Sequence, residues 1–135
     1  MLTAEVLKNL GIPTEKFNAS FEGMMRVGRE RLLALQRADG GFAWFDRGDA
    51  DPLMTAIVLH GLQECDRLGW KVDQVSLKRG RDRLRAFAKG EADLDLLAYQ
   101  AYVLGEEFDR LLAKKDELTA YARALLALTL HRAGR

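Results

Sequence analysis

Hydrophobic and polar positions alternate along most of the chain with the spacing of an α-helix. From Phe21 to Arg37, apolar residues recur every three or four positions, and arginine and glutamate stand between them. The segment Val75–Lys89 repeats this pattern. Such spacing is typical of a helix with one buried and one solvated face, called here an outer helix. We expect outer helices in both segments and a third at Phe108–Lys115.

The first two outer segments also resemble each other residue by residue. Gly28–Leu35 aligns without gaps onto Gly80–Phe87, with Gly, Arg, Arg, Leu and Ala at the same places. This self-similarity indicates a repeated architecture. Glycine inside a helix costs about 1 kcal/mol relative to alanine, so its recurrence predicts that a neighbouring backbone approaches closely at Gly28 and at Gly80.

Three other segments are apolar on nearly every side, namely Leu53–Leu68, Leu94–Leu104 and Leu118–Leu130. A helix with this composition is expected to be buried nearly all round, and we call it an inner helix. In each segment an alanine is followed six positions later by a leucine. These pairs are Ala56 and Leu62, Ala98 and Leu104, and Ala120 and Leu126.

Residues that favour helix ends stand where the pattern requires them. Asp51 precedes Pro52, which predicts an N-cap followed by a proline at the first helical position, and Asp93 can cap the next inner helix. Glycines able to adopt a left-handed conformation should close helices. They are Gly69, Gly90, Gly105 and Gly134.

Together these elements predict an all-α single domain covering residues 1–135, with three outer/inner pairs. The pairs are 21–37 with 53–68, 75–89 with 94–104, and 108–115 with 118–132. Residues 1–10 are interpreted as the tail of an earlier inner helix.

Composition narrows the possible partners. The 135 residues are 48% apolar and 30% charged, with a net charge of +1, which is typical of a globular protein with no overall field to hold nucleic acid. No apolar run is long enough to cross a membrane. Cys65 is the single cysteine, so an internal disulfide is impossible.

Candidate chemical groups are few and scattered. His60 and Cys65 are five positions apart, about 140° around a helix, so they share no face for a metal ion. The acidic loop with Asp46, Asp49 and Asp51 lacks the converging oxygens that a hard cation needs. We therefore expect no catalytic residue, metal site or cofactor.

Other conspicuous side chains are expected to have structural roles. The alternating arginines at 79, 81, 83 and 85 predict a solvated outer face with acidic neighbours, not a phosphate site. Aromatic residues could line a pocket or an axial hollow, but packing is their expected role. These are Phe42, Trp44, Phe45, Tyr99, Tyr102 and Tyr121.

The segment Gln36–Phe45 has the most specific sequence in the chain, Gln-Arg-Ala-Asp-Gly-Gly-Phe-Ala-Trp-Phe. It resembles the glutamine/tryptophan turn of α/α toroids. The resemblance implies that Gln36 satisfies free N–H groups at the start of a neighbouring inner helix and that an aromatic side chain packs over it. Glycine permits the sharp reversal. The residues of the turn motif are Gln36, Asp39, Gly40, Gly41, Phe42 and Trp44.

Three segments in order, Arg31–Gln36, Asp39–Phe45 and Asp51–Ala56, resemble the thioester-containing domain of bacterial α2-macroglobulin-like proteins. Arg123–Leu128 is similar to a late inner helix of that domain. The resemblance implies a partial α/α toroid, of the kind also found in terpenoid cyclases and protein prenyltransferases, excised from a larger ring. It also implies a secreted or periplasmic parent protein that offers proteases a bait and changes shape when cut.

The thioester of this family needs a Cys-x-x-Gln motif. Cys65 is followed three positions later by Leu68, so no residue of this chain can form the thioester. The expected function is therefore that of a structural, non-enzymatic fragment of a protease inhibitor, with target proteases as partners of the parent.

Two other interpretations remain open. One is a fragment of a terpenoid cyclase or prenyltransferase, although the cyclase Asp-x-Asp-Asp motif is incomplete at Asp93–Leu96. The other is a stand-alone helical repeat that binds a peptide on its concave side. In an open fragment, apolar helix faces left exposed would favour association with another copy or a partner.

Overall fold

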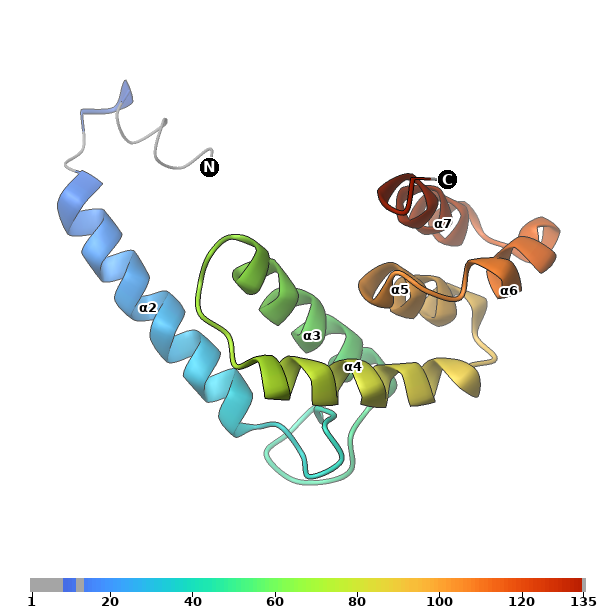
Figure 1. Cartoon of the computed structure of the whole chain (residues 1–135), viewed down its shortest axis with the longest axis horizontal. Helices are drawn as coiled ribbons and strands as arrows, with labels where there is room; N and C mark the ends of the chain where they lie inside the picture. Colours follow the sequence, from blue (N-terminus) through green and yellow to red (C-terminus); the bar gives the residue numbers. More distant parts are fainter. Residues whose placement is uncertain (1–8, 12–13, 135) are drawn as a thin grey trace. The chain divides into compact units, whose positions relative to one another are not determined.

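The structure, a computed structural model, describes residues 9–11 and 14–134. Within these residues it contains helices, turns and loops and no strand, which confirms the all-α prediction (Figure 1). The chain divides between Ala34 and Leu35 into two compact units, and each is described by itself. The single-domain prediction stays a prediction.

The first unit contains α2, Thr14–Ala34. This helix ends three residues before the predicted Arg37. On its solvated side, Arg26 and Glu30 form an exposed ion pair at 3.4 Å, one helical turn apart. Gly28 lies in this unit, and no described residue of the unit packs within 4 Å of a Cβ placed on it, so the predicted close approach of another backbone is not found there. The helical tail expected at 1–10 falls almost wholly outside the described residues.

The second unit contains the remaining helices, and their bounds agree closely with the sequence pattern. They are α3 at Pro52–Arg67, α4 at Gln74–Lys89, α5 at Leu94–Leu104, α6 at Phe108–Ala113, a 3-10 helix at Lys115–Glu117, and α7 at Ala120–Arg132. The last outer helix is shorter than predicted because the chain changes to the 3-10 conformation after Ala113. No membrane-spanning helix occurs in the described part of the chain.

Side-chain caps fix the starts of four helices, α3, α4, α5 and α7. The Asp51 carboxylate accepts a hydrogen bond from the amide of Met54 at 2.9 Å, and Pro52 follows it in the first helical turn. Asp93 caps α5 as predicted. Two caps were missed by the sequence analysis, Asp73 of α4 and Thr119 of α7.

Helix ends follow the glycine pattern with one exception. Gly69, Gly105 and Gly134 have positive φ angles, as expected of residues that close a helix. Gly90 has φ of −99° and was wrongly assigned a left-handed conformation.

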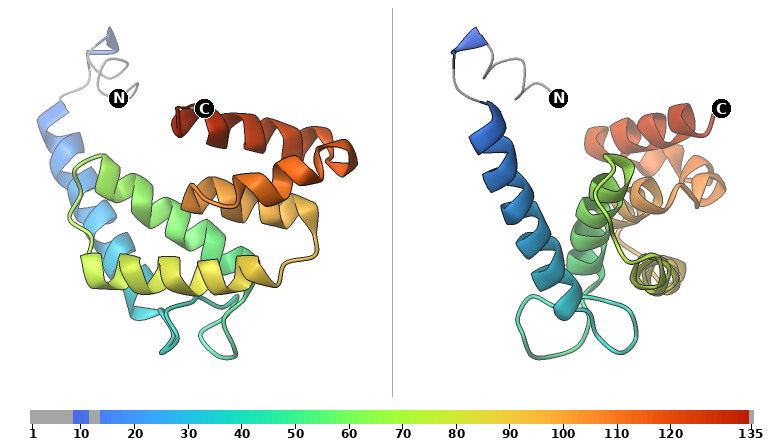
Figure 2. Two further views of the ribbon diagram at one scale, coloured as in Figure 1. Left: turned by 45° about the vertical axis from the view of Figure 1, so that its right-hand side comes forward. Right: turned by 60° about the vertical axis from the view of Figure 1, so that its left-hand side comes forward.

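The helices of the second unit form two layers, with α3, α5 and α7 in one and α4 and α6 in the other (Figure 2). α3, α5 and α7 run in the same direction. Two contacts show this for α5 and α7. At the start of both helices the Thr119 hydroxyl donates to Asp95, and near the end of both the Arg132 guanidinium lies 4.9 Å from the centre of the Tyr102 ring. The fully buried apolar side chains include Leu59, Leu62, Leu84, Leu97 and Leu111.

Burial of the inner helices differs from the prediction. Only α5 lacks exposed residues over its whole length, because it contacts all of α3, α4, α6 and α7. On α3, Leu53 and Ile57 remain 37% and 44% exposed, and Leu128 of α7 remains 50% exposed. The prediction of burial on all sides was wrong for α3 and α7, since each has a face that no helix of this unit covers.

One polar side chain lies in the core without a visible partner. Gln100 of α5 is fully buried, and neither its amide nitrogen nor its amide oxygen has a hydrogen-bond partner among the described residues. Burial of an unpaired amide opposes folding, because the group gives up its hydrogen bonds to water.

Replacing this amide with an apolar side chain of similar size should stabilise the protein. We expect Gln100→Met to raise the free energy of unfolding by about 1 kcal/mol, measured by urea denaturation followed by circular dichroism. A fall in the free energy of unfolding would contradict the absence of a partner for the Gln100 amide.

Candidate functional site: the Gln36 turn and the α4 arginines

The segment Leu35–Phe42, called here the Gln36 turn, closes on itself through backbone bonds. The amide of Arg37 donates to the carbonyl of Gly41 at 2.8 Å, and the amide of Gly40 donates to the carbonyl of Arg37 at 2.9 Å. The Asp39 carboxylate accepts another bond from the amide of Gly41 at 2.9 Å. The turn therefore has a defined shape although it belongs to no helix.

Gln36 joins this turn to α4. Its Nε2 donates to the carbonyl of Gly40 and to the carbonyl of Ser76, each at 2.9 Å. Ser76 lies in the first turn of α4, so one side-chain amide bridges two segments about forty positions apart in the chain. The role implied by the resemblance was wrong in its chemistry, because Gln36 donates to two carbonyl groups and, among the described residues, no N–H group donates to its side chain.

The two glycines of the turn are required by close contact. Gly40 has φ of +93°, and a Cβ there would lie 2.8 Å from the carbonyl carbon of Arg79. A Cβ on Gly41 would lie 2.5 Å from the Cβ of Ala50. On the facing helix, a Cβ on Gly80 would lie 3.7 Å from the carbonyl oxygen of Gly40. The nearest atom to that position is Cδ1 of Leu59 at 3.1 Å, so the tight neighbour at Gly80 is a side chain, and the predicted backbone lies at ordinary contact distance.

Phe42 connects the turn to the start of α3. Its ring is 2% exposed, and its amide donates to the Thr55 hydroxyl at 3.0 Å. The same hydroxyl donates to the Phe42 carbonyl at 3.3 Å, and the Asp51 amide donates to that carbonyl at 2.8 Å. Because Asp51 also caps α3, the turn and the first turn of α3 form one bonded unit.

Trp44 does not have the role implied for the tryptophan of the turn. Its side chain is 58% exposed and that of Phe45 is 79% exposed, so the expectation that they pack was wrong for both. Phe42, two positions earlier, supplies the buried aromatic ring. The loop beyond Phe42 turns outward, where the Arg37 guanidinium donates to the carbonyls of Phe45 and Asp46.

The α4 arginines have the acidic neighbours that the sequence predicted, since Arg83 and Arg85 both form ion pairs. Their face is less solvated than predicted, because the guanidinium groups also bind neighbouring segments of the chain. Arg79 donates to the carbonyls of Arg37 and Ala38 at 3.0 and 2.8 Å. Arg83, one helical turn later, pairs with the Asp39 carboxylate at 3.0 Å. These two side chains therefore hold the Gln36 turn against α4.

The other two arginines contact the end of α5. Arg81 donates to the side-chain oxygen of Gln63 and to the carbonyl of Leu104. Arg85 forms two bonds to the carboxylate of Glu106, at 2.8 and 2.7 Å. Alternation in sequence thus separates the four arginines into two pairs on two faces of α4, a division that their spacing of four could have suggested.

Burial and ion pairing shift the pKa values of several side chains in the second unit. The hydrogen bonds from Arg85 hold the pKa of Glu106 below its ordinary value, and the same bonds raise the pKa of Arg85. The hydrogen bond from Lys78 lowers the pKa of Asp82. Burial raises the pKa of Tyr99. These groups stay charged, or neutral for Tyr99, near pH 7.

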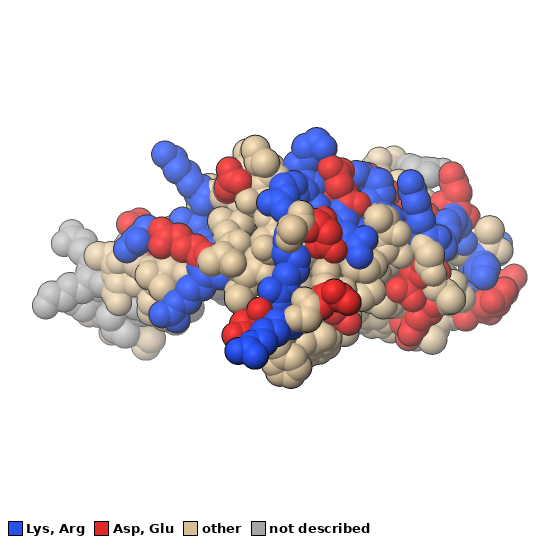
Figure 3. All heavy atoms as spheres, turned by 90° about the horizontal axis from the view of Figure 1, so that it is seen from below, with Lys and Arg blue, Asp and Glu red and all other residues tan. Residues whose placement is uncertain are grey.

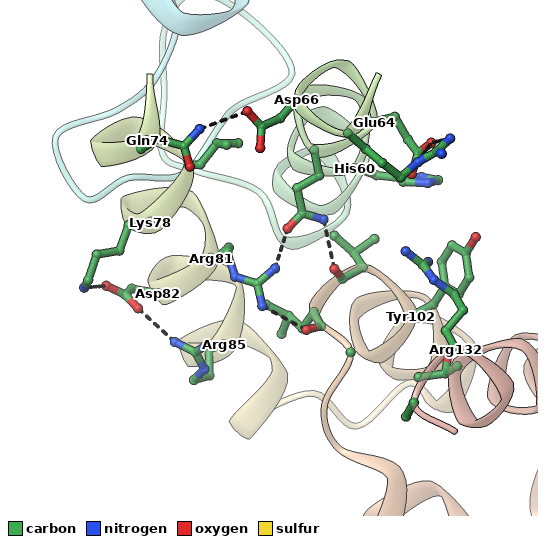
Figure 4. Close-up of a pocket in the computed structure, with 18 residues that line it drawn as sticks. His60, Glu64, Asp66, Gln74, Lys78, Arg81, Asp82, Arg85, Tyr102 and Arg132 are labelled. Atoms are coloured by element: carbon green, nitrogen blue, oxygen red, sulfur yellow. Dashed lines mark hydrogen bonds and ion pairs between the residues drawn. The ribbon is translucent and has the colours of Figure 1, made fainter. Parts of the chain in front are cut away.

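A groove of about 770 Å³ lies between α3, α4 and the C-terminal ends of α5 and α7 (Figure 4). Several of its charges form ion pairs, Lys78 with Asp82 at 2.7 Å, Asp82 with Arg85 at 2.8 Å, and Arg67 with Glu64 at 2.7 Å. Asp66 and Arg81, which also line the groove, bond to uncharged groups. One face of the molecule likewise shows acidic and basic side chains interspersed (Figure 3). The groove therefore contains charges of both signs and is not a pocket of one charge.

His60 and Cys65, the two residues weighed as metal ligands in the sequence, have different surroundings in the structure. His60 lies edge-on to the rings of Tyr99 and Tyr102, and its Nδ1 is 3.1 Å from the Tyr99 hydroxyl. Cys65 is half-buried and free. In the part of the chain that the structure describes, no three His, Cys, Asp or Glu side chains are grouped as metal ligands.

Comparison with known proteins gives two similar sequences. The chain is 33% identical over 101 residues to a Thermotoga maritima protein named alpha-2-macroglobulin, covering 75% of this chain and 6% of that protein. It is 32% identical over 128 residues to the Escherichia coli K12 alpha-2-macroglobulin, covering 92% of this chain and 7% of that protein. No protein-family model and no solved structure matches the chain.

The chain therefore spans only a small part, 6 to 7%, of the length of these curated relatives. Their names support an α2-macroglobulin-like relationship, as the sequence predicted. The names refer to the whole proteins and do not say to which domain the matched segment belongs.

The close contact at Gly40 can be tested against a glycine with similar backbone geometry. Gly40 and Gly48 have φ of +93° and +97°, but only Gly40 has a backbone against the position of a Cβ. We expect Gly40→Ala to lower the free energy of unfolding by at least about 2 kcal/mol more than Gly48→Ala, by chemical denaturation. Equal losses would show that α4 does not contact the turn.

The bond between Arg85 and Glu106 should make stability depend on pH. The pKa of Glu106 is lower in the folded state than in the unfolded state. The ionised carboxylate therefore stabilises the fold above its unfolded-state pKa, and this stabilisation is lost as the pH falls through its folded-state pKa. Both side chains are about one third exposed, so we expect Glu106→Gln to cost about 0.5 to 1 kcal/mol at pH 7.

That difference between wild type and Glu106→Gln should shrink below about pH 4, followed by urea denaturation across pH. Glu117→Gln is the matched control, since Glu117 is exposed and has the same charge. A loss for Glu106→Gln that is unchanged at low pH would contradict the ion pair.

Proposed function

We propose that this chain is a structural segment of the helical, thioester-type domain of an α2-macroglobulin-like protease inhibitor, and that it is not an enzyme. The observation that carries the proposal is the similarity to an α2-macroglobulin over 92% of the chain. Target proteases are then partners of the whole protein, which is placed in the periplasm or secreted.

The arrangement of the helices supports a toroidal domain. Parallel helices α3, α5 and α7 form one layer, and α4 and α6 lie in the other, so each inner helix is followed by an outer one (Figures 1 and 2). A ring of such pairs is an α/α toroid. The proposal assigns this chain an arc of the ring, with its inner helices toward the axis.

The residues described above then have a mechanical role. The Gln36 turn fixes α3 to α4, and Arg81 and Arg85 fix α4 to the end of α5. An inhibitor that changes shape when its bait is cut needs domains that move as rigid bodies. Covalent capture would require a Cys-x-x-Gln motif elsewhere in the protein, because Cys65 has Leu68 at the position of the glutamine.

Protease trapping can be measured on the full-length protein that contains this chain. After incubation with trypsin, we expect hydrolysis of casein to fall at least about tenfold, while hydrolysis of a small chromogenic peptide is largely retained, because a trapped protease still admits small substrates. Protein cleaved beforehand by a protease that is then inactivated should have no effect.

Two outcomes would contradict the proposal. Unchanged casein hydrolysis would exclude an inhibitor of trypsin-like proteases, and equal loss of both activities would indicate an ordinary active-site inhibitor. The 135-residue chain alone should inhibit neither reaction, since the proposal gives it no protease site.

A further inference from the structure

The helices α3, α5 and α7 can be compared position by position, because each begins at a side-chain cap. The caps are Asp51, Asp93 and Thr119, and each accepts a hydrogen bond from a backbone amide two or three residues later. Five positions after the cap, all three helices have an alanine. These alanines are Ala56, Ala98 and Ala124. The sequence analysis wrongly matched Ala120 with the first two, because Ala120 is the first residue of α7 after its cap.

In the first two helices, the face that contains this alanine is covered by the next helix of the layer. Ala56 and Ala98 are each 0% exposed. Nine positions after the cap, His60 of α3 lies against the Tyr99 and Tyr102 rings of α5. At the same position of α5, Tyr102 lies beneath the Arg132 guanidinium of α7. Each helix thus uses one face to bind its successor.

In α7 the same face is open. Ala124 is exposed, and Leu128, nine positions after the cap, is 50% exposed. Tyr121 on this face is 54% exposed. The face contains no aspartate, glutamate, lysine or arginine. It consists of Ala120, Tyr121, Ala124, Ala127, Leu128 and His131. A helix surface of this composition is typical of one that another helix covers.

We propose that this face of α7 binds a further helix of the same polypeptide, running parallel to α7 and placing apolar or aromatic side chains on Ala124 and Leu128. The proposal rests on the proposed function, in which the chain is a segment of a longer protein. Its relatives are long enough to supply such a helix, since the chain spans only 6 to 7% of them.

A parallel helix is the proposed occupant of this face because it would repeat the packing seen at the two existing interfaces of the layer. The α3–α5 and α5–α7 contacts are both parallel and both bury the alanine at the same position, so a third contact of the same kind fits α7 without a new geometry. Two copies meeting through α7 alone would form a two-fold, antiparallel contact, which differs from this series.

Cysteine labelling in the full-length protein tests the proposal. The variants are Ala124→Cys and Leu128→Cys on the face, with Lys115→Cys on the exposed 3-10 helix as the control. Iodoacetamide modification of each peptide is followed by mass spectrometry. We expect positions 124 and 128 to react at least about tenfold more slowly than position 115, because a covered thiol is inaccessible. Ala124→Cys adds a single sulfur atom, and Leu128→Cys checks the result independently.

Labelling of positions 124 and 128 as fast as position 115 would overturn the proposal. Protection that disappears on dilution would also overturn it, because a second molecule would then cover the face. Protection without protease trapping would retain this inference and reject the proposed function, whereas trapping without protection would do the reverse.

Discussion

The Gln36 turn lies against two helices at once, and the relative position of α3 and α4 depends on this double contact. On one side, Gln36 donates to the Ser76 carbonyl of α4. On the other side, both backbone groups of Phe42 bond to Thr55 of α3. The contact with α4 leaves no room for a side chain at Gly40, so steric fit and hydrogen bonding act at the same point.

The effect of this contact extends through α4 to the rest of the second unit. Arg79 and Arg83 bind the turn, while Arg81 and Arg85, on another face, bind the segment that ends α5. Because α5 in turn contacts α6 and α7, a change at the turn is connected to every helix of this unit.

The sequence predicted the helices well and the contacts of side chains less well. Periodicity and capping predicted both ends of α3 to within one residue and both ends of α5 exactly. Helix ends can be predicted in this way because they depend on local residues such as Asp51 and Gly105. The partners of Arg79 lie about forty positions away in the chain, and periodicity does not identify such distant contacts. The exposure of Trp44 was not predicted because the resemblance implied that an aromatic side chain of the turn packs. The donor role of Gln36 depends on which backbone groups face its amide, and only the fold determines that.

The central claim, that the turn is an integral part of the packed unit, is tested most directly by amide hydrogen exchange of single residues. The amides of Phe42 and Asp51 are bonded to Thr55 and to the Phe42 carbonyl, whereas Arg47 lies in the exposed loop between them. The account predicts that the Phe42 and Asp51 amides exchange only when the whole unit unfolds, as slowly as the amide of Leu59 in α3, and that Arg47 exchanges far faster. Exchange of the Phe42 amide at the rate of Arg47 would contradict it.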